Sequence, residues 1–488
     1  MPKKKLPNII LIVLDTARAK SFSCYGYHRK TTPNIDRIAE EGVLYKWCFS
    51  PANWTIPSHA SLFTGLYPSE HLCYAGNLFL DVNIPTLAEL LRSIGYRTIG
   101  ISCNGLVGKI YGFDRGFDIF HELCVRPNIV NVKPLAGTTI TKKVIEVIKL
   151  LPARPYLAAK HILRALLMHL RTSMSNSTPY TLRAFKLAQK YVSEYILRDK
   201  KPLFLFVNIM QTHERYNPPK RTRGKFGSNG FKYESILLGS TSFYLRDFCP
   251  HIPEGHMWEV LTSLYDEELL FADLCVGQLY SFLKLSRVMD NTVFIVTSDH
   301  GEMLGEHRLY GHMFSLHNEV IHVPLIVQYP DLKRGEVVHR IVQLHDLFST
   351  ICEITEIPYP TPLSSISLFG NNRRKWALVQ DLDPLADVLS LKARQPDWDV
   401  TTHVPTLWRF PSFAIIKSDL VKIIKPSNGS PFFFDIRTDY NECYPQIVCE
   451  ESVLQLISDV EKLFNWDSSR YEEEIKRQVD ASGNEVSA

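Results

Sequence analysis

The sequence lacks the long apolar run of a membrane span, and it has no strong excess of one charge. No stretch approaches the roughly 20 uninterrupted apolar residues that cross a bilayer. The 55 Lys and Arg residues are balanced by 51 Asp and Glu residues, so the net charge of +4 gives no reason to expect a nucleic-acid partner. Because 45% of the 488 residues are hydrophobic, the chain can bury a large core.

Closely spaced cysteine pairs are also missing. None of the ten cysteines belongs to a C-x-x-C pair, which excludes the common zinc-knuckle and dithiol redox motifs. Scattered thiols are typical of a reducing compartment. The start MPKKKLPNIILIVLD combines basic residues with a short apolar run, as a signal peptide does, but it has no small-residue cleavage site. We therefore expect this run to be a buried strand and the protein to be cytoplasmic.

Several catalytic signatures are absent as well. No G-x-x-x-x-G-K-[ST] or G-x-G-x-x-G occurs, which argues against P-loop and dinucleotide-binding enzymes. The order H-E-x-x-H is missing too, although Glu302, Glu306 and His307 lie close together in the sequence. A zinc protease is therefore excluded.

The chain does contain a series of short apolar segments rich in β-branched residues, separated by helical patterns. The segments are residues 8–15, 97–103, 202–210, 291–299 and 323–329. Apolar runs without polar alternation predict central, mostly parallel strands that are covered on both faces. In the first helical pattern between them, Thr32 is expected to cap a helix that Gly42 ends. The alternation predicts an α/β fold with a large doubly wound sheet and a ligand site beyond the carboxyl ends of its strands.

The pattern changes after about residue 370. Residues 412–426 and 430–439 are typical of antiparallel strands, and residues 453–464 are typical of a helix. We therefore divide the chain into a catalytic domain at 1–370 and a small C-terminal antiparallel sheet-plus-helix subdomain at 371–488.

Two segments interrupt the first domain. Residues 133–201 are a basic helical insert with fourteen Lys and Arg against three acidic residues, and residues 221–253 are a loop insert rich in Gly, Ser and aromatic side chains. The basic insert is either a helical subdomain with a solvated face or a surface for anionic substrates or lipid headgroups. The second interpretation includes peripheral contact with a membrane.

Groups that can carry chemistry stand where predicted strands end. Asp15 ends the first strand, and Asp299 and His300 leave a later strand together. The segment TIPSHASLFTG at 55–65 adds hydroxyl and imidazole groups. Two carboxylates and an imidazole that converge at one edge of a sheet make a divalent-metal site. The alternative for any single Asp at a strand end is a helix cap or a turn.

These residues lie within longer segments that resemble the sulfatase family of the alkaline phosphatase superfamily. The resemblance rests on NIILIVLDTARA, TIPSHASLFTG, FLFVNIMQTHERYNPP, YDEELLFADLCVGQL, VTSDHGEMLGEH, EVIHVPLIVQYP and FFFDIRTDYNE, which occur in this order. They extend over nearly the whole chain apart from the two inserts. The resemblance implies a metal-dependent ester hydrolase with a large α/β domain and a four-stranded C-terminal sheet domain.

Position by position, the resemblance implies metal ligands at Asp15, Asp299 and His300, together with Thr55 at the family's nucleophile position. Sulfatases have a Cys or Ser there that is converted to formylglycine, and no such route exists from Thr. Since water must cleave a Thr ester, Thr55 favours phosphorus esters, whereas the family alone favours a sulfuric ester as in arylsulfatases. The alternative interpretation of Thr55 is a helix N-cap, because Pro57 follows.

The resemblance also implies that His213 and His312 bind the transferred group and assist the leaving group, and that His59 contacts the substrate. His59 replaces the family's Arg, His312 replaces a common Lys, and Thr16 replaces a second Asp. Fewer fixed cations favour a monoanion over a dianionic phosphate monoester. The expected substrate is a phosphodiester, a phosphonate monoester or a sulfate ester, either small or part of a lipid or polymer.

We expect one divalent metal ion. A single His among oxygen ligands favours Mn²⁺ or Zn²⁺, while Ca²⁺ and Mg²⁺ are the family's alternatives. Nucleotide pyrophosphatase/phosphodiesterases share the Thr spacing, but their second zinc site needs one Asp and two His that the sequence does not place. Phosphonate monoester hydrolases are the better comparison. The remaining alternative is a non-catalytic binding protein that has kept the fold.

Three further histidines follow the Asp-His pair. We interpret His317 and His322 as core or surface groups, and His307 as a residue that supports the metal ligands. The sequence leaves the oligomeric state open.

Overall fold

The computed structural model describes residues 6–75, 77–123, 177–214, 216–227, 256–312, 315–359, 363–382, 411–426, 430–446 and 451–463. Residues 133–176 of the predicted basic insert and 228–253 of the predicted loop insert lie outside the described residues. In the described part of the chain, no helix is long and apolar enough to cross a membrane.

One large sheet forms the centre of the molecule. Its strands are β1 (Asn8–Leu14), β2 (Val43–Phe49), β3 (Arg97–Ser102), β4 (Ile119–Glu122), β5 (Leu203–Ile209), β6 (Thr292–Thr297), β9 (His322–Val323), β10 (Leu325–Gln328) and β11 (Glu336–Gln343). Their order in space is β11-β2-β10-β6-β1-β5-β3-β4, and β9 pairs with β2. β1 is parallel to both β5 and β6, whereas β10 is antiparallel to β6 and β2. The predicted mostly parallel sheet is confirmed.

The central strands are buried because both faces of the sheet are covered. Every residue of β1, β5 and β6 is buried. Alternate side chains of β1 enter different cores, Ile10 and Ile12 on one face and Ile9 and Leu11 on the other. Apolar side chains on both faces explain why the sequence of β1 has no polar alternation.

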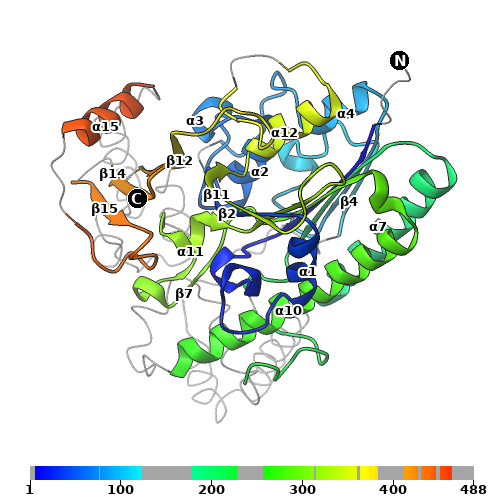
Figure 1. Ribbon diagram of the computed structural model, residues 1–488, viewed down its shortest axis with the longest axis horizontal. Coiled ribbons are helices and arrows are strands. Elements are labelled where there is room, and N and C mark those ends of the chain that lie inside the picture. Colours follow the sequence, from blue (N-terminus) through cyan, green and yellow to red (C-terminus); the bar gives the residue numbers. More distant parts are fainter. Residues whose placement is uncertain are drawn as a thin grey trace, which may run out of the picture.

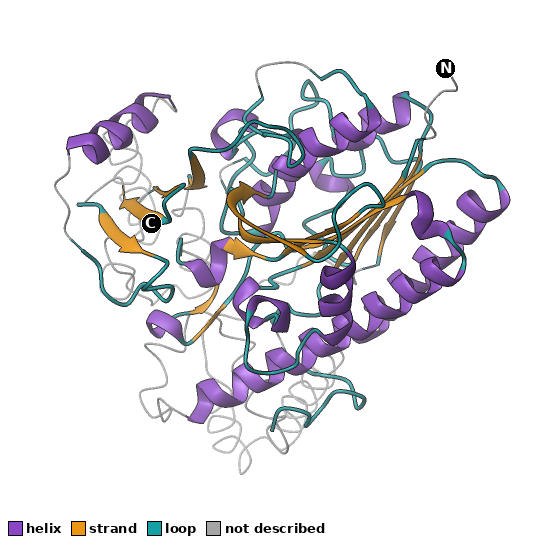
Figure 2. Cartoon of the chain, in the orientation of Figure 1, coloured by secondary structure: helices purple, strands orange, loops and turns teal. Residues whose placement is uncertain are grey.

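Helices cover the two faces of this sheet (Figure 2). On one side lie α1 (Pro33–Glu41), α7 (Thr178–Tyr191) and α10 (His256–Leu285), and on the other lie α2 (Thr55–Thr64), α4 (Leu87–Ser93) and α12 (Asp346–Thr355). The short helices α3 (Pro68–His71) and α11 (Asn318–Ile321) lie in connections. So do a π-helical turn (Val192–Arg198) and short 3₁₀ turns (Ala19–Ser21, Ser23–Tyr25, Lys109–Tyr111, Val288–Asn291, Glu306–Arg308).

The start of α1 is capped from a distant helix. Thr32 occupies the N-cap position and Gly42 follows the last turn, as predicted. The Thr32 hydroxyl, however, donates to Asp36 and does not cap the helix. The carboxylate of Asp273 on α10 accepts the backbone N–H group of Ile35 at 2.8 Å and takes over this function. A tertiary contact thus replaces the predicted local cap.

A second, smaller sheet lies toward the C-terminus (Figure 1). It consists of the antiparallel strands β12 (Trp376–Asp381), β13 (Ser412–Lys417), β14 (Val421–Pro426) and β15 (Phe432–Asp435), and α15 (Glu451–Leu463) packs on it. Its other face shares a core with the hairpin of β7 (Met303–Leu304) and β8 (Tyr310–Gly311) and with α11. The predicted small sheet with a helix is confirmed, and the boundary at 370 stays a prediction.

Gly301 connects the large sheet to α11 by a close backbone approach. Its N–H group donates to the Val320 carbonyl at 2.6 Å. A Cβ atom at this position would lie 2.1 Å from the Glu319 carbonyl oxygen and 2.9 Å from Arg18 Cβ. Only glycine fits here without a shift of the backbone that follows His300.

We expect Gly301→Ala to destabilise the protein by about 1–3 kcal/mol, because the added methyl group overpacks a rigid contact. The measurement is urea unfolding followed by circular dichroism. Gly370→Ala is the control, since the nearest atoms to its added Cβ are 3.9 Å away. Equal stability of both variants would contradict the proposed constraint.

Candidate active site

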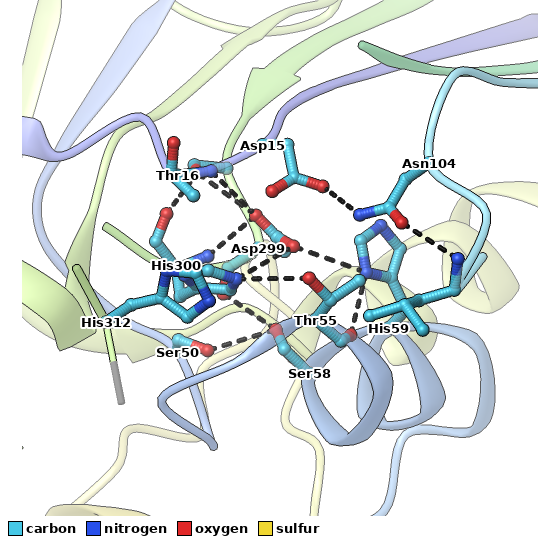
Figure 3. A network of polar contacts seen from close by, with 12 residues as sticks. Asp15, Thr16, Ser50, Thr55, Ser58, His59, Asn104, Asp299, His300 and His312 are labelled. Atoms are coloured by element: carbon cyan, nitrogen blue, oxygen red, sulfur yellow. Dashed lines mark hydrogen bonds and ion pairs between the residues drawn. The ribbon is translucent and has the colours of Figure 1, made fainter. Parts of the chain in front are cut away.

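The carboxyl ends of adjacent strands bring Asp15, Asp299 and His300 together. Asp15 follows β1, and Asp299 and His300 follow β6, the parallel neighbour of β1. All three side chains are buried, and one ligand atom from each lies within 4.8 Å of the others. The three side chains therefore converge in the structure, as expected for residues at the carboxyl ends of neighbouring parallel strands (Figure 3).

The two carboxylates each use one oxygen for the protein. Asp299 Oδ1 accepts the backbone N–H groups of Thr16 at 3.2 Å and His300 at 2.9 Å, and Asp15 Oδ2 accepts the Asn104 amide at 2.7 Å. Asp15 Oδ1 and Asp299 Oδ2 are buried with no hydrogen-bond partner among the described residues. Burial, followed by the charge of Asp15, raises the pKa of Asp299 well above its usual value. Unpaired buried carboxylate oxygens are the donor set that fits a divalent cation.

His300 presents a lone pair to the same point. Its Nδ1–H group donates to the Gly301 carbonyl at 3.0 Å, which leaves Nε2 unprotonated. Nε2 lies 3.3 Å from Thr55 Oγ1 and 3.4 Å from Asp299 Oδ2. Burial, followed by the charge of His312, lowers the pKa of His300 well below its usual value. A neutral imidazole fixed in this way has the form of a metal ligand.

Thr55 is the first residue of α2. The N-cap position belongs to Trp54, so the alternative interpretation of Thr55 as the cap is wrong. The Thr55 hydroxyl points away from its own helix and toward His300 (Figure 3). The positive end of the ten-residue helix α2 therefore faces the carboxylate pair and the space in front of it.

His59 lies one turn further along α2 and is fully buried. Its Nδ1–H group donates to the Thr55 carbonyl at 2.9 Å, and its Nε2 accepts the Asn208 amide at 3.0 Å. Burial lowers the pKa of His59, so the ring is neutral at neutral pH. Both ring nitrogens thus have protein partners, and the contact between His59 and substrate that the sequence suggested stays a prediction.

His312 and His213 stand on the other side of His300. The ring of His312 lies 4.4 Å from that of His300 and 5.4 Å from that of His213, measured between centroids. Glu302 holds His312 through Nδ1 at 2.9 Å and accepts the Tyr216 hydroxyl at 3.1 Å. Burial alone would lower the pKa of His213, but the carboxylates of Glu302 and Asp15 raise it to about 9. His213 is therefore a cation at neutral pH.

Three residues of this network were missed from the sequence. Asn104 follows β3 and orients Asp15, Asn208 interrupts the apolar run of β5 and contacts His59, and Glu302 orients His312. Asn208 could have been found from the sequence, because a side-chain amide in a fully buried strand needs a hydrogen-bond partner. The sequence offered no such signal for Glu302, because acidic residues are common in loops.

The remaining histidines take other places. His322 is buried, which agrees with its interpretation as a core group. Its Nε2–H group donates to the Lys46 carbonyl at 2.9 Å, and its Nδ1 accepts the Tyr440 hydroxyl at 2.8 Å. His307 and His317 stack on each other and face Glu442. They form a separate cluster, and among the described residues neither is hydrogen-bonded to Asp15, Asp299 or His300.

Comparison with known proteins shows the family to which this chain belongs. The family model described as Sulfatase matches residues 7–357, which is more than half of the chain. The chain belongs to the sulfatase family. Its members are ester-bond hydrolases of the alkaline phosphatase superfamily. The family and the enzyme class that were inferred from the sequence are therefore confirmed.

Individual sulfatase-family relatives are distant. The uncharacterized sulfatase YidJ of Escherichia coli is 25% identical over 399 residues, covering 77% of this chain and 73% of the relative. The N-acetylglucosamine-6-O-sulfatase of Bacteroides thetaiotaomicron is 24% identical over 396 residues, with 75% and 70% covered. Among solved structures, the phosphonate monoester hydrolase of Agrobacterium radiobacter aligns with a TM-score of 0.64 and 18% identity, covering 94% of this chain and 95% of that one. The structural likeness supports the fold.

A buried carboxyl group fixes the segment that carries His213. Glu268 on α10 accepts the Asn217 N–H group at 2.6 Å and the side-chain amide of Gln211, on either side of His213. Burial raises the pKa of Glu268 to about 8, from an ordinary 4.5. Because the folded-state pKa is raised, the stability that this group contributes is fully present below pH 4.5 and is lost as the pH rises through about 8.

We expect the melting temperature to fall between about pH 5 and pH 8, and Glu268→Gln, which imitates the protonated form, to reduce this fall. The measurement is thermal unfolding across that range. Glu353→Gln, at an exposed position, is the control and should keep the wild-type pH dependence. An unchanged pH dependence in Glu268→Gln would show that Glu268 is ionised in the folded protein.

Proposed function

We propose that this sulfatase-family protein is a metal-dependent hydrolase that cleaves a monoanionic phosphodiester or phosphonate monoester through Thr55. The single observation that supports this most is the position of the Thr55 hydroxyl. It lies at the N-terminus of α2, 3.3 Å from His300 Nε2 and beside the unpaired oxygens of Asp15 and Asp299. A hydroxyl in this place has the surroundings of an activated nucleophile.

We assign the metal site to Asp15, Asp299, His300 and Thr55. The two unpaired carboxylate oxygens and the lone pair of His300 fit one divalent ion, with Mn²⁺ or Zn²⁺ favoured and Ca²⁺ or Mg²⁺ as alternatives. When bound, such an ion supplies Lewis-acid chemistry, lowering the pKa of a neighbouring hydroxyl and offsetting charge on the substrate.

The other groups of the site have complementary tasks. Thr55 gives up its hydroxyl proton to solvent water, and its Oγ then bonds to phosphorus as the bond to the leaving oxygen breaks in line. The positive end of α2 faces the charge that develops. His213, which is protonated at neutral pH, donates its proton to the leaving oxygen and then accepts one from the water that cleaves the Thr ester. His312 binds a nonbridging oxygen in an orientation that Glu302 sets.

The charge of the pocket favours a monoanionic substrate. His59 is neutral and buried, so this position supplies no cation, whereas His213 is protonated. A dianionic phosphate monoester needs more fixed positive charge than this. His59 instead acts as a positioning residue, because it links the carbonyl of Thr55 to Asn208.

A sulfuric ester is the second candidate substrate. Relatives named as sulfatases support it, among them the N-acetylglucosamine-6-O-sulfatase of Bacteroides thetaiotaomicron. A sulfate ester is also a monoanion, so the charge of the pocket accepts it. The nucleophile separates the two candidates, because Thr55 forms an ester that only water can cleave.

We expect Thr55→Ala to lose at least about 100-fold in kcat, because the nucleophile is removed. Thr55→Ser should keep much of the activity, since it keeps a hydroxyl group. Thr64→Ala is the matched control in the same helix, because the Thr64 hydroxyl donates to the Ala60 carbonyl at 2.7 Å and not to the site. Full activity in Thr55→Ala would refute the assignment.

A panel of aryl esters tests the substrate class. We expect kcat/KM to be higher for a bis-aryl phosphodiester and an aryl phenylphosphonate than for the aryl phosphate monoester, because the pocket has few fixed cations. The assay includes p-nitrophenyl sulfate and is run with Mn²⁺, Zn²⁺, Ca²⁺ and Mg²⁺. If the sulfate is the best substrate and its turnover is lost in Thr55→Ala, the protein is a sulfatase with a Thr nucleophile. No turnover of any ester with any metal favours the non-catalytic alternative.

A further inference from the structure

A second group of metal-ligand side chains lies where the C-terminal sheet meets the segment after β6. His307 stands between β7 and β8, His317 precedes α11, and Glu442 follows β15. One ligand atom from each residue lies within 4.8 Å of the others. None of the three belongs to the candidate active site described above.

The two histidines are held together without full hydrogen bonding. Their rings are stacked, with centroids 3.8 Å apart and planes at 11°, so one ring must rotate before the in-plane lone pairs of both reach one ion. His307 Nε2 is buried and has no hydrogen-bond partner among the described residues. A buried ring nitrogen without a partner costs free energy, so its presence calls for an unseen partner. His307 (φ 52°) and Glu442 (φ 54°) also have left-handed backbones, which non-glycine residues seldom adopt.

The carboxylate of Glu442 is fixed from behind. Its Oε2 accepts the backbone N–H group of Asn318 at 2.7 Å and faces His317 Nδ1 at 3.1 Å, and its Oε1 pairs with Lys422 Nζ at 2.6 Å. Glu442 and Lys422 are both fully buried. Outer contacts of this kind orient a metal-ligating carboxylate. The positive charge of Lys422 weakens the attraction of this cluster for a metal ion. Lys422 pairs with Glu442 and not with the two histidines.

We propose that His307, His317 and Glu442 bind a zinc ion between the catalytic part of the chain and the C-terminal sheet. Two imidazoles and one carboxylate are a known three-residue zinc ligand set, with a fourth position left for water. Both histidine side chains are partly exposed, while His307 Nε2 itself is buried. Because of Lys422, the ion binds more weakly here than at Asp15 and Asp299.

The position of the cluster gives the ion a structural task. His312, which we assign to the active site, lies between His307 and His317 in the sequence. An ion on both histidines fixes the two ends of the segment that carries His312, and Glu442 ties that segment to the C-terminal sheet. The second ion therefore supports the active site without touching the substrate.

Zinc titration of the metal-stripped full-length protein tests the proposal. Elemental analysis after removal of free zinc should find two equivalents in the wild type, one in Asp299→Ala, one in His317→Gln and none in the double variant. In His317→Gln the side chain can still hydrogen-bond to Glu442 but has no imidazole. His339→Ala, an exposed histidine outside both clusters, should keep two equivalents.

Thermal unfolding gives a second readout. Zinc should raise the melting temperature of Asp299→Ala and leave that of the double variant unchanged. If His317→Gln does not fold, His307→Gln takes its place. The proposal is overturned if His317→Gln binds as many zinc equivalents as the wild type. If Asp299→Ala keeps both equivalents, the metal site of the proposed function is refuted. The zinc content of His317→Gln then still decides whether the histidine cluster binds an ion.

Discussion

Electrostatic repulsion between two buried carboxylates is the constraint on which the rest of the structure depends. Asp15 and Asp299 end neighbouring parallel strands, and each has one oxygen with no hydrogen-bond partner among the described residues. Burial and their mutual repulsion favour protonation of Asp299, as its raised pKa shows. A cation between them removes this cost, so the sheet needs a ligand at this edge to keep both groups ionised.

The surroundings of the carboxylates are built to hold this arrangement rigidly. Gly301 lets α11 approach the backbone directly after His300, and Asn104 and Asn208 hold Asp15 and His59 from neighbouring strands. His59 stands where the family resemblance implies an Arg, and its neutral ring contacts the Thr55 carbonyl at the start of α2. We propose that charge for binding an anion comes instead from the helix end and His213.

The C-terminal sheet is coupled to the site through one short segment. The hairpin of β7 and β8 shares a core with strands of that sheet, and His312 follows this hairpin directly. Glu442 reaches back to the same segment at His317. Changes in the C-terminal part of the chain can therefore alter the position of His312, which lies far from it in the sequence.

The sequence by itself determined the fold class and the outline of the site. Apolar runs without alternation identified β1, β3, β5, β6 and β10, because a strand covered on both faces has no polar face to show. Polar residues at strand ends identified Asp15, Asp299 and His300, because parallel strands end at one edge of a sheet. Thr55 came from the family resemblance, and its role stays a prediction.

Only the tertiary structure decided which partners these groups have. Asp273 caps α1 in place of Thr32, Asn208 and the Thr55 carbonyl engage both nitrogens of His59, and Glu302 orients His312. Such contacts join residues far apart in the chain, and no local pattern records them. The pKa of a buried group depends on these partners as well. The sequence could therefore name the ionisable residues of the site, while their charges were decided by the packing around them.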